Sequence, residues 1–228
     1  MTHASRFRTS NNISARKIDD KDIHFIRHGV TEMNVYLGRY DYDAADFIDP
    51  LMYDTRLTSE GEDMARKLNV KLHSLQPVPE LLVASPLSRA LRTADLAFEG
   101  IAVPREITPL AAERVWHASD IGRDPNQLAH EFDLWNFEEL ESVWWYSQSG
   151  HPQAVDEESP GSFHKRMEAL REWLGRSVLL PSQQNFTRNF LQIFRHTTTK
   201  KIPHFPITVE VVKPLRNQVD YGQRPKPF

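Results

Sequence analysis

Short apolar segments alternate with amphipathic helical patterns in the first half of the chain, and this alternation constrains the fold most. An apolar strand pattern at residues 22–27 precedes a helical pattern at 56–75, and a second strand at 81–84 precedes a helix at 86–98. Strands that alternate with helices favour a parallel sheet with helices on its faces. The sequence therefore predicts an α/β fold, a three-layer α/β/α sandwich with a mostly parallel central sheet.

Capping residues and apolar periodicity define the remaining elements. Thr58 or Ser59 can cap the first long helix, and Ser59 with Glu62 has the spacing of a capping box. The other expected elements are short helices at about 125–133 and 137–147, a helix at 159–174 with an apolar stripe of Phe163, Met167, Leu170 and Leu174, and strands at 189–194 and 206–212.

Length and composition limit the number of domains and the classes of partner. With 228 residues, 39% of them hydrophobic, the chain can form one sizeable domain. Its net charge of −3 creates no overall attraction to nucleic acid or to an anionic membrane. No apolar run in the sequence approaches the roughly 18 residues of a membrane helix, so neither partner is expected. Cysteine is absent, which fits a reducing compartment such as the cytoplasm.

Charge divides the chain into three regions. Residues 1–20 are basic before Asp19, which favours a disordered tail and also weakly resembles an organellar targeting peptide. Residues 21–180 would form the main domain. Residues 181–228 hold eight basic and two acidic residues, whereas the rest of the chain holds 20 basic and 29 acidic ones. This basic segment would be a divergent tail or would supply the last strands of the same domain.

Polar side chains follow both N-terminal strands at the point where each strand ends. Arg27, His28 and Gly29 follow the first, while Ser85 ends the second and Arg89 lies on the first turn of the next helix. The carboxyl ends of parallel strands meet at one edge of a sheet, where ligands commonly bind. Guanidinium groups suit phosphate oxygens, a helix start adds backbone donors, and glycine permits a tight turn. This pattern predicts a phosphate-binding crevice.

Each of these features also has a purely structural explanation. The segment Arg27–Gly29 could be the polar end of an ordinary strand. Arg89 could lie on a surface helix, where its aliphatic part would cover apolar neighbours while its charged end stays in water. The motifs taken singly leave this choice open.

A metal site and a cofactor are not expected. His24 and His28 have the spacing of a ligand pair on a helix, but on a strand of about 3.3 Å per residue they would lie about 13 Å apart. Glu113 and His117 are also four positions apart, yet only Asp120 lies close in sequence as a third ligand.

Four motifs together carry a family resemblance: FIRHGVTEMN, LTSEGEDMARKL, VASPLSRALRTA and LAAERVWHASDIGR. Over residues 22–175 the chain resembles the histidine phosphatase superfamily, the phosphoglycerate-mutase-like proteins. The resemblance implies that His28 is the nucleophile that accepts the phosphoryl group. It also implies that Arg27 and Arg89 hold the phosphate and stabilise its charge. Two further matching residues would line the same pocket, Thr31 and Asn34.

The resemblance places a general acid and base at Glu113, with a pKa raised by a partly buried site. Without the resemblance, the residues alone favour a solvated surface acid. Such proteins carry a second pocket histidine near the C-terminus, but no His-Gly pair follows residue 29 in this chain. His196, after the apolar segment 189–194, is the positional candidate. Alternatively, His196 is an exposed histidine in a divergent tail.

An aromatic cluster lies between Glu113 and the last helix. Packing in the core explains it, and a hydrophobic lid that reads the non-phosphate part of a substrate is the alternative. The cluster consists of Trp135, Phe137, Trp144, Trp145 and Tyr146.

The sequence therefore predicts a phosphatase that hydrolyses a phosphomonoester through a phosphohistidine at His28. A phosphoglycerate-mutase-like phosphotransferase is the enzymatic alternative. A catalytically weak phospho-ligand-binding protein is the third, if His196 does not complete the site. The expected partner is a phosphorylated small molecule rather than a phosphoprotein.

Overall fold

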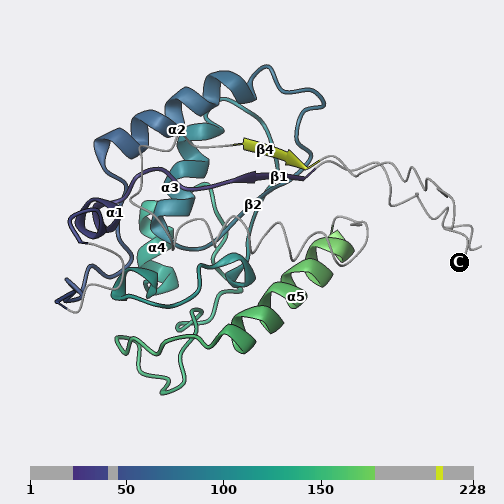
Figure 1. The fold of residues 1–228 in the computed structure, drawn as a ribbon. Coiled ribbons are helices and arrows are strands. Elements are labelled where there is room, and N and C mark those ends of the chain that lie inside the picture. The colour runs from purple at the N-terminus through teal and green to yellow at the C-terminus, as the bar shows by residue number, and fades with distance from the viewer. Residues whose placement is uncertain (1–22, 41–45, 178–208, 213–228) are drawn as a thin grey trace, which may run out of the picture.

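A computed structural model describes residues 23–40, 46–177 and 209–212. These residues form a mixed α/β structure (Figure 1). In chain order its elements are β1 (Ile23–Ile26), α1 (Glu32–Leu37), α2 (Ser59–Leu72), β2 (Leu82–Ala84), α3 (Ser88–Ala97), β3 (Arg105–Ile107), the 3-10 helices η2 (Pro109–Ala111) and η3 (Ala118–Asp120), α4 (Pro125–Glu131), α5 (Pro160–Ser177) and β4 (Val209–Val212).

The described strands form one antiparallel and one parallel pair. β1 pairs antiparallel with β4, with Ile26 opposite Val209. β2 pairs parallel with β3, with Leu82 opposite Arg105. The predicted α/β class is thus confirmed, with a small parallel sheet. The finer arrangement, three layers around one mostly parallel sheet, stays a prediction.

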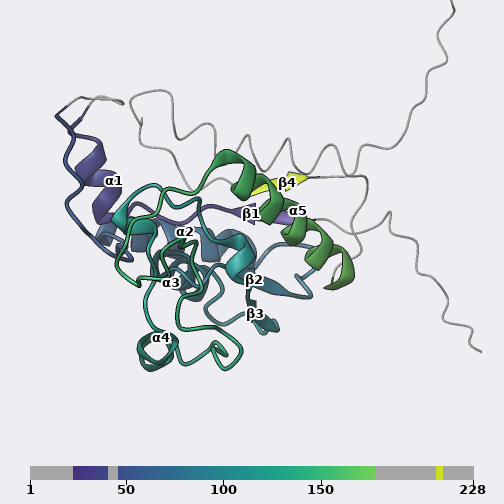
Figure 2. The same ribbon diagram turned by 90° about the horizontal axis from the view of Figure 1, so that it is seen from below.

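Helices lie on both sides of the strands (Figures 1 and 2). α2 packs against α3, and both share a core with Leu82 and Ala84 of β2. Val83 packs instead against α5. Alternate residues of a strand point to opposite faces, so β2 contributes to both clusters. The apolar stripe predicted for α5 is confirmed, and its buried residues are Phe163, Met167, Leu170 and Leu174.

The start of α2 differs from the predicted capping box. Thr58 is the N-cap, and its hydroxyl accepts a hydrogen bond from a backbone N–H of the first turn at 3.1 Å. The Glu62 side chain pairs with Arg66 and Arg92 on the helix surface. Because Thr58 is the N-cap, the third helical position is Gly61 rather than Glu62, so a capping box of Ser59 with Glu62 does not form.

The helix predicted at 137–147 is wrong, because this segment is irregular. Its buried aromatic residues recur at a spacing that imitates a helix. Trp144 packs so closely on Gly122 that a Cβ there would lie 2.1 Å from the indole ring. The Trp144 indole N–H also donates to the carbonyl oxygen of Arg123 at 3.0 Å. These contacts of Trp144 with residues distant in sequence hold the segment 137–147 in an irregular conformation.

Several expectations concern segments beyond this description. The predicted tail 1–20, the strand at 189–194 and His196 lie outside the described residues. Within the described ranges, none of the helices combines the length and the hydrophobicity that crossing a membrane requires.

Candidate active site

The segment after β1 lies tightly against the start of α2 and the middle of α3. A Cβ on Gly29 would lie 2.4 Å from the carbonyl oxygen of Gly61, so only glycine permits this approach. The backbone N–H of Gly29 donates to the hydroxyl of Thr93 on α3 at 3.1 Å. The glycine predicted to allow a turn therefore also fixes the preceding residue, His28, beside α3.

The His28 imidazole is a neutral ring with a lone pair on Nε2. Its side chain is 14% exposed, and Nδ1 lies 2.7 Å from the carbonyl oxygen of Gly29. A carbonyl oxygen only accepts, so Nδ1 carries the proton and donates it. Burial, assisted by the charge of Arg89, lowers the pKa of His28 to about 4. At neutral pH the Nε2 atom is consequently unprotonated and nucleophilic.

The lowered pKa of His28 makes its contribution to folding stability depend on pH. Between the ordinary value of 6.5 and about 4, the unfolded chain binds a proton at His28 that the folded protein does not. The free energy of unfolding should therefore fall as pH decreases through this window, by at most about 1.4 kcal/mol per pH unit from this group. Chemical denaturation at pH 7 and pH 4.5 measures the loss, which should be smaller in His28→Ala. An equal loss in both proteins would contradict the assignment.

Arg89 is the centre of a buried charge cluster. It is 3% exposed, and its guanidinium donates to Glu113 Oε2 at 2.8 Å and to Asp120 Oδ1 at 3.0 Å. A further N–H donates to the carbonyl oxygen of Ser119 at 2.6 Å. Glu113 Oε2 in turn lies 3.9 Å from His28 Nε2. Three residues singled out in the sequence, His28, Arg89 and Glu113, thus meet in space.

Arg27 adds a second guanidinium to this cluster. It is half-buried, and within the described part of the chain it makes no hydrogen bond or ion pair. Burial lowers the pKa of Arg27, the charge of Glu113 opposes this shift, and the charge of Arg89 adds to it. The forked donors of Arg27 are therefore not engaged by these neighbours, a state suited to binding an oxyanion.

The two carboxyl groups of the cluster ionise differently from the sequence expectation. Burial opposes ionisation of Glu113, but the charges of Arg89, His28 and Arg27 and the hydrogen bond from Arg89 together outweigh it, so the pKa of Glu113 is lowered. Burial and the charge of Glu113 raise the pKa of Asp120 to about 6. The raised pKa that was expected at Glu113 is found instead at Asp120.

Asp120 is the residue of this cluster that sequence reasoning missed. Its Oδ2 accepts hydrogen bonds from the backbone N–H groups of Trp116 and His117, at 3.1 and 3.0 Å, and Oδ1 accepts from Arg89. Asp120 ends the three-residue 3-10 helix η3, which is too short for a helical or strand period to mark it in the sequence. The sequence indicated Asp120 only as a possible third metal ligand. No group of described residues is arranged to hold a metal ion.

Thr31 and Asn34 form the capping box of α1. The Thr31 hydroxyl accepts from the Asn34 backbone N–H at 3.1 Å, and the Asn34 side-chain oxygen accepts from the Thr31 backbone N–H at 3.1 Å. These bonds fix the start of α1 three residues after His28. Their predicted contact with a ligand, like that of His196, stays a prediction.

The N-terminus of α3 does not offer the free donors that the sequence suggested. The carboxylate of Asp54 accepts from the Ser88 backbone N–H at 2.8 Å and from its hydroxyl. Arg123 pairs with the same carboxylate, its Nε donating at 2.9 Å. The Ser88 N–H at this helix start is therefore already used by a carboxylate of the protein.

Comparison with known proteins places this cluster in a family context. The family model described as Histidine phosphatase superfamily (branch 1) matches residues 23–210. A comparison with curated proteins gave no match.

Solved structures that are similar to the chain include three phosphatases. The alpha-ribazole phosphatase from Shigella flexneri is 26% identical, with 69% of this chain and 68% of that chain covered and a TM-score of 0.42. The ecdysone phosphate phosphatase from Bombix mori, in complex with tungstate, is 13% identical, with 92% and 98% covered and a TM-score of 0.48. The phosphoserine phosphatase from Entamoeba histolytica, in complex with 3-phosphoglyceric acid, is 22% identical, with 68% of each chain covered and a TM-score of 0.38.

The family model spans most of the chain, including every residue of the charge cluster described above. The predicted resemblance is thereby confirmed, and this chain belongs to the histidine phosphatase superfamily, branch 1.

Proposed function

We propose that this protein hydrolyses phosphomonoesters through a phosphohistidine at His28. The observation that carries the proposal is the neutral His28 ring, whose Nε2 bears the lone pair beside Arg89 and 3.9 Å from Glu113. A nucleophile that is unprotonated at neutral pH and lies among cations is the arrangement that covalent phosphoryl transfer needs. Membership of the superfamily supports the same reaction class.

The phosphate would be bound by the two arginines of the cluster. Arg27 offers guanidinium donors that no described residue uses, and Arg89 is rigidly positioned by its bonds to Glu113 and Asp120. Arginine forks match phosphate oxygens and stabilise the charge that spreads over them in the transition state. Because Arg89 is held before the substrate arrives, little reorganisation accompanies binding.

The reaction would proceed in two balanced steps. First, the Nε2 lone pair of His28 forms a bond to phosphorus while the ester P–O bond breaks, and Glu113 gives its proton to the leaving oxygen. Second, a water molecule attacks phosphorus, the N–P bond breaks, and Glu113 takes the proton from the water. Inorganic phosphate and the alcohol are the products.

Glu113 must hold a proton at the start of this cycle, although its pKa is lowered by Arg89. The negative charge of a bound phosphate would raise that pKa, because like charges disfavour ionisation of a nearby carboxyl group. The bound phosphate would also accept hydrogen bonds from the guanidinium of Arg89. This would weaken the ion pair between Arg89 and Glu113. The substrate itself would thus prepare the general acid.

We further propose a phosphorylated small molecule as the substrate, and no cofactor. For the fold, we propose the three-layer α/β/α arrangement, since α2 and α3 pack on one side of the described strands and α5 on the other.

A trapping experiment tests the phosphohistidine. Wild-type protein mixed with a radiolabelled phosphomonoester and denatured in alkali should retain label, and the label should be released by mild acid, because an N–P bond is acid-labile and base-stable. Phosphoserine would survive the acid, and an acyl phosphate would not survive the alkali, so either result would overturn the proposal. Added glycerol that captures most of the phosphoryl group would indicate a phosphotransferase rather than a hydrolase.

A further inference from the structure

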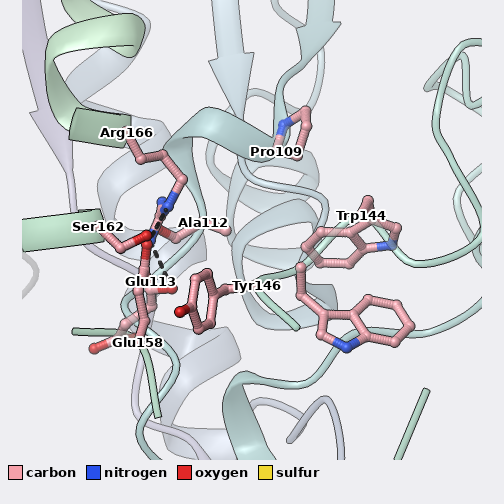
Figure 3. A pocket seen from close by; sticks show the side chains of 9 residues that line it. Pro109, Ala112, Glu113, Trp144, Tyr146, Glu158, Ser162 and Arg166 are labelled. Atoms are coloured by element: carbon pink, nitrogen blue, oxygen red, sulfur yellow. Dashed lines mark hydrogen bonds and ion pairs between the residues drawn. The ribbon is translucent and has the colours of Figure 1, made fainter. Parts of the chain in front are cut away.

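A cavity of about 160 Å³ adjoins the candidate active site, and Glu113 lines both. We propose that this cavity binds the alcohol portion of the phosphomonoester, and that this portion is an uncharged group about the size of one ring. The inference rests on the proposed function. In Figure 3, Arg166 lies on one side of the cavity, Trp144 on the other and Tyr146 between them. The walls that carry the argument are Trp144, Trp145, Tyr146, Ser162 and Arg166.

The charged residues of the cavity have no capacity left for a charged ligand. Arg166 uses one edge of its guanidinium on the fully buried carboxylate of Glu158, with Nε donating at 3.1 Å and Nη2 at 2.6 Å. Its other N–H groups donate to the carbonyl oxygens of Leu110, Ala112 and Glu113. A guanidinium has five N–H donors, and all five are used. The cavity is therefore not a second anion site, and a neutral group fits it.

Size and wall chemistry narrow the ligand to a ring. A protein cavity of roughly 150 Å³ lined by apolar side chains accommodates benzene, and this one is of similar volume. Aromatic walls from Trp144, Trp145 and Tyr146 favour flat or cyclic groups through offset and edge-to-face contacts. The aromatic cluster seen in the sequence thus serves two purposes, since Trp144 also packs in the core.

The position of Glu113 explains how one substrate would occupy both the phosphate site beside His28 and the cavity. Its carboxylate contacts Arg89 and faces His28 Nε2, where the phosphorus would lie. The leaving oxygen must lie beside this same carboxyl group to receive its proton. The carbon attached to that oxygen is then next to the cavity wall, and the ring extends into the cavity.

A cavity-filling variant tests the inference. Ser162 lies at the partly exposed edge of the cavity in the first turn of α5, so Ser162→Leu should block the cavity without removing core packing. Benzyl phosphate and glycerol phosphate are both esters of primary alcohols, and only the first carries a ring. We expect Ser162→Leu to lower kcat/KM for benzyl phosphate by about ten-fold or more. The value for glycerol phosphate and inhibition by inorganic phosphate should stay unchanged.

Lys165→Leu is the matched control, because Lys165 is exposed on the same helix. This variant should leave kcat/KM unchanged for both esters. If Ser162→Leu affects both esters alike, or neither, the cavity inference fails while the proposed function stands. If wild type hydrolyses neither ester and does not bind phosphate, the proposed function fails. The cavity inference is then tested by measuring the binding of benzyl alcohol with ligand-observed NMR. We expect benzyl alcohol to bind the wild-type protein and not to bind Ser162→Leu. Absence of binding to wild type would overturn the inference.

Discussion

Replacing His28 by alanine is expected to lower kcat for para-nitrophenyl phosphate by about 1,000-fold or more, because the reaction loses its nucleophile. Phosphate binding should survive, since Arg27 and Arg89 remain and Arg89 keeps its bonds to Glu113 and Asp120. The inhibition constant of inorganic phosphate should therefore change by less than about three-fold, a difference smaller than one lost hydrogen bond produces. Steady-state kinetics with phosphate as inhibitor measures both quantities.

His130→Ala is the control for this prediction, because His130 is exposed on α4 and takes no part in the charge cluster. It should retain wild-type kinetics. Equal turnover by wild type and His28→Ala would mean that another group attacks phosphorus. A large fall in both turnover and phosphate binding would instead indicate that the substitution collapses the site.

The elements that the sequence predicted are those specified by local patterns. The strand ending at Ile26 and the helix beginning at Ser88 both follow short-range signals, an apolar run that stops at charged residues and a Ser-Pro start. The order of the motifs then indicated that His28, Arg89 and Glu113 belong to one site. Their side chains do lie together in the structure.

What the sequence missed depends on contacts between distant segments. Asp54 accepts the hydrogen bond of the Ser88 backbone N–H at the start of α3, although it lies 34 positions earlier in the chain. Trp144 determines an irregular backbone by packing on Gly122. The ionisation of Glu113 depends on how closely Arg89 approaches it, a distance that no local pattern specifies. Such features follow from the folded arrangement rather than from periodicity or capping.

Replacing Arg89 by methionine is expected to lower the free energy of unfolding at pH 8 by about 3–5 kcal/mol, because a buried ion pair loses one partner. The change would leave the carboxyl groups of Glu113 and Asp120 without the guanidinium that both now contact. Without that cation the folded-state pKa values of both carboxyl groups rise, so protonation at lower pH relieves their mutual repulsion. The deficit relative to wild type should therefore narrow between pH 8 and pH 5, as measured by urea denaturation.

Two variants separate this cause from simple loss of packing. Arg92→Met removes an exposed arginine of the same helix that pairs with Glu62, and it should cost less than about 1 kcal/mol. Adding Asp120→Asn to Arg89→Met removes one of the stranded charges and should recover about 1–2 kcal/mol at pH 8 while flattening the pH dependence. If the double variant is as unstable as Arg89→Met at every pH, repulsion between the carboxylates is not what Arg89 relieves, and its buried position serves packing alone.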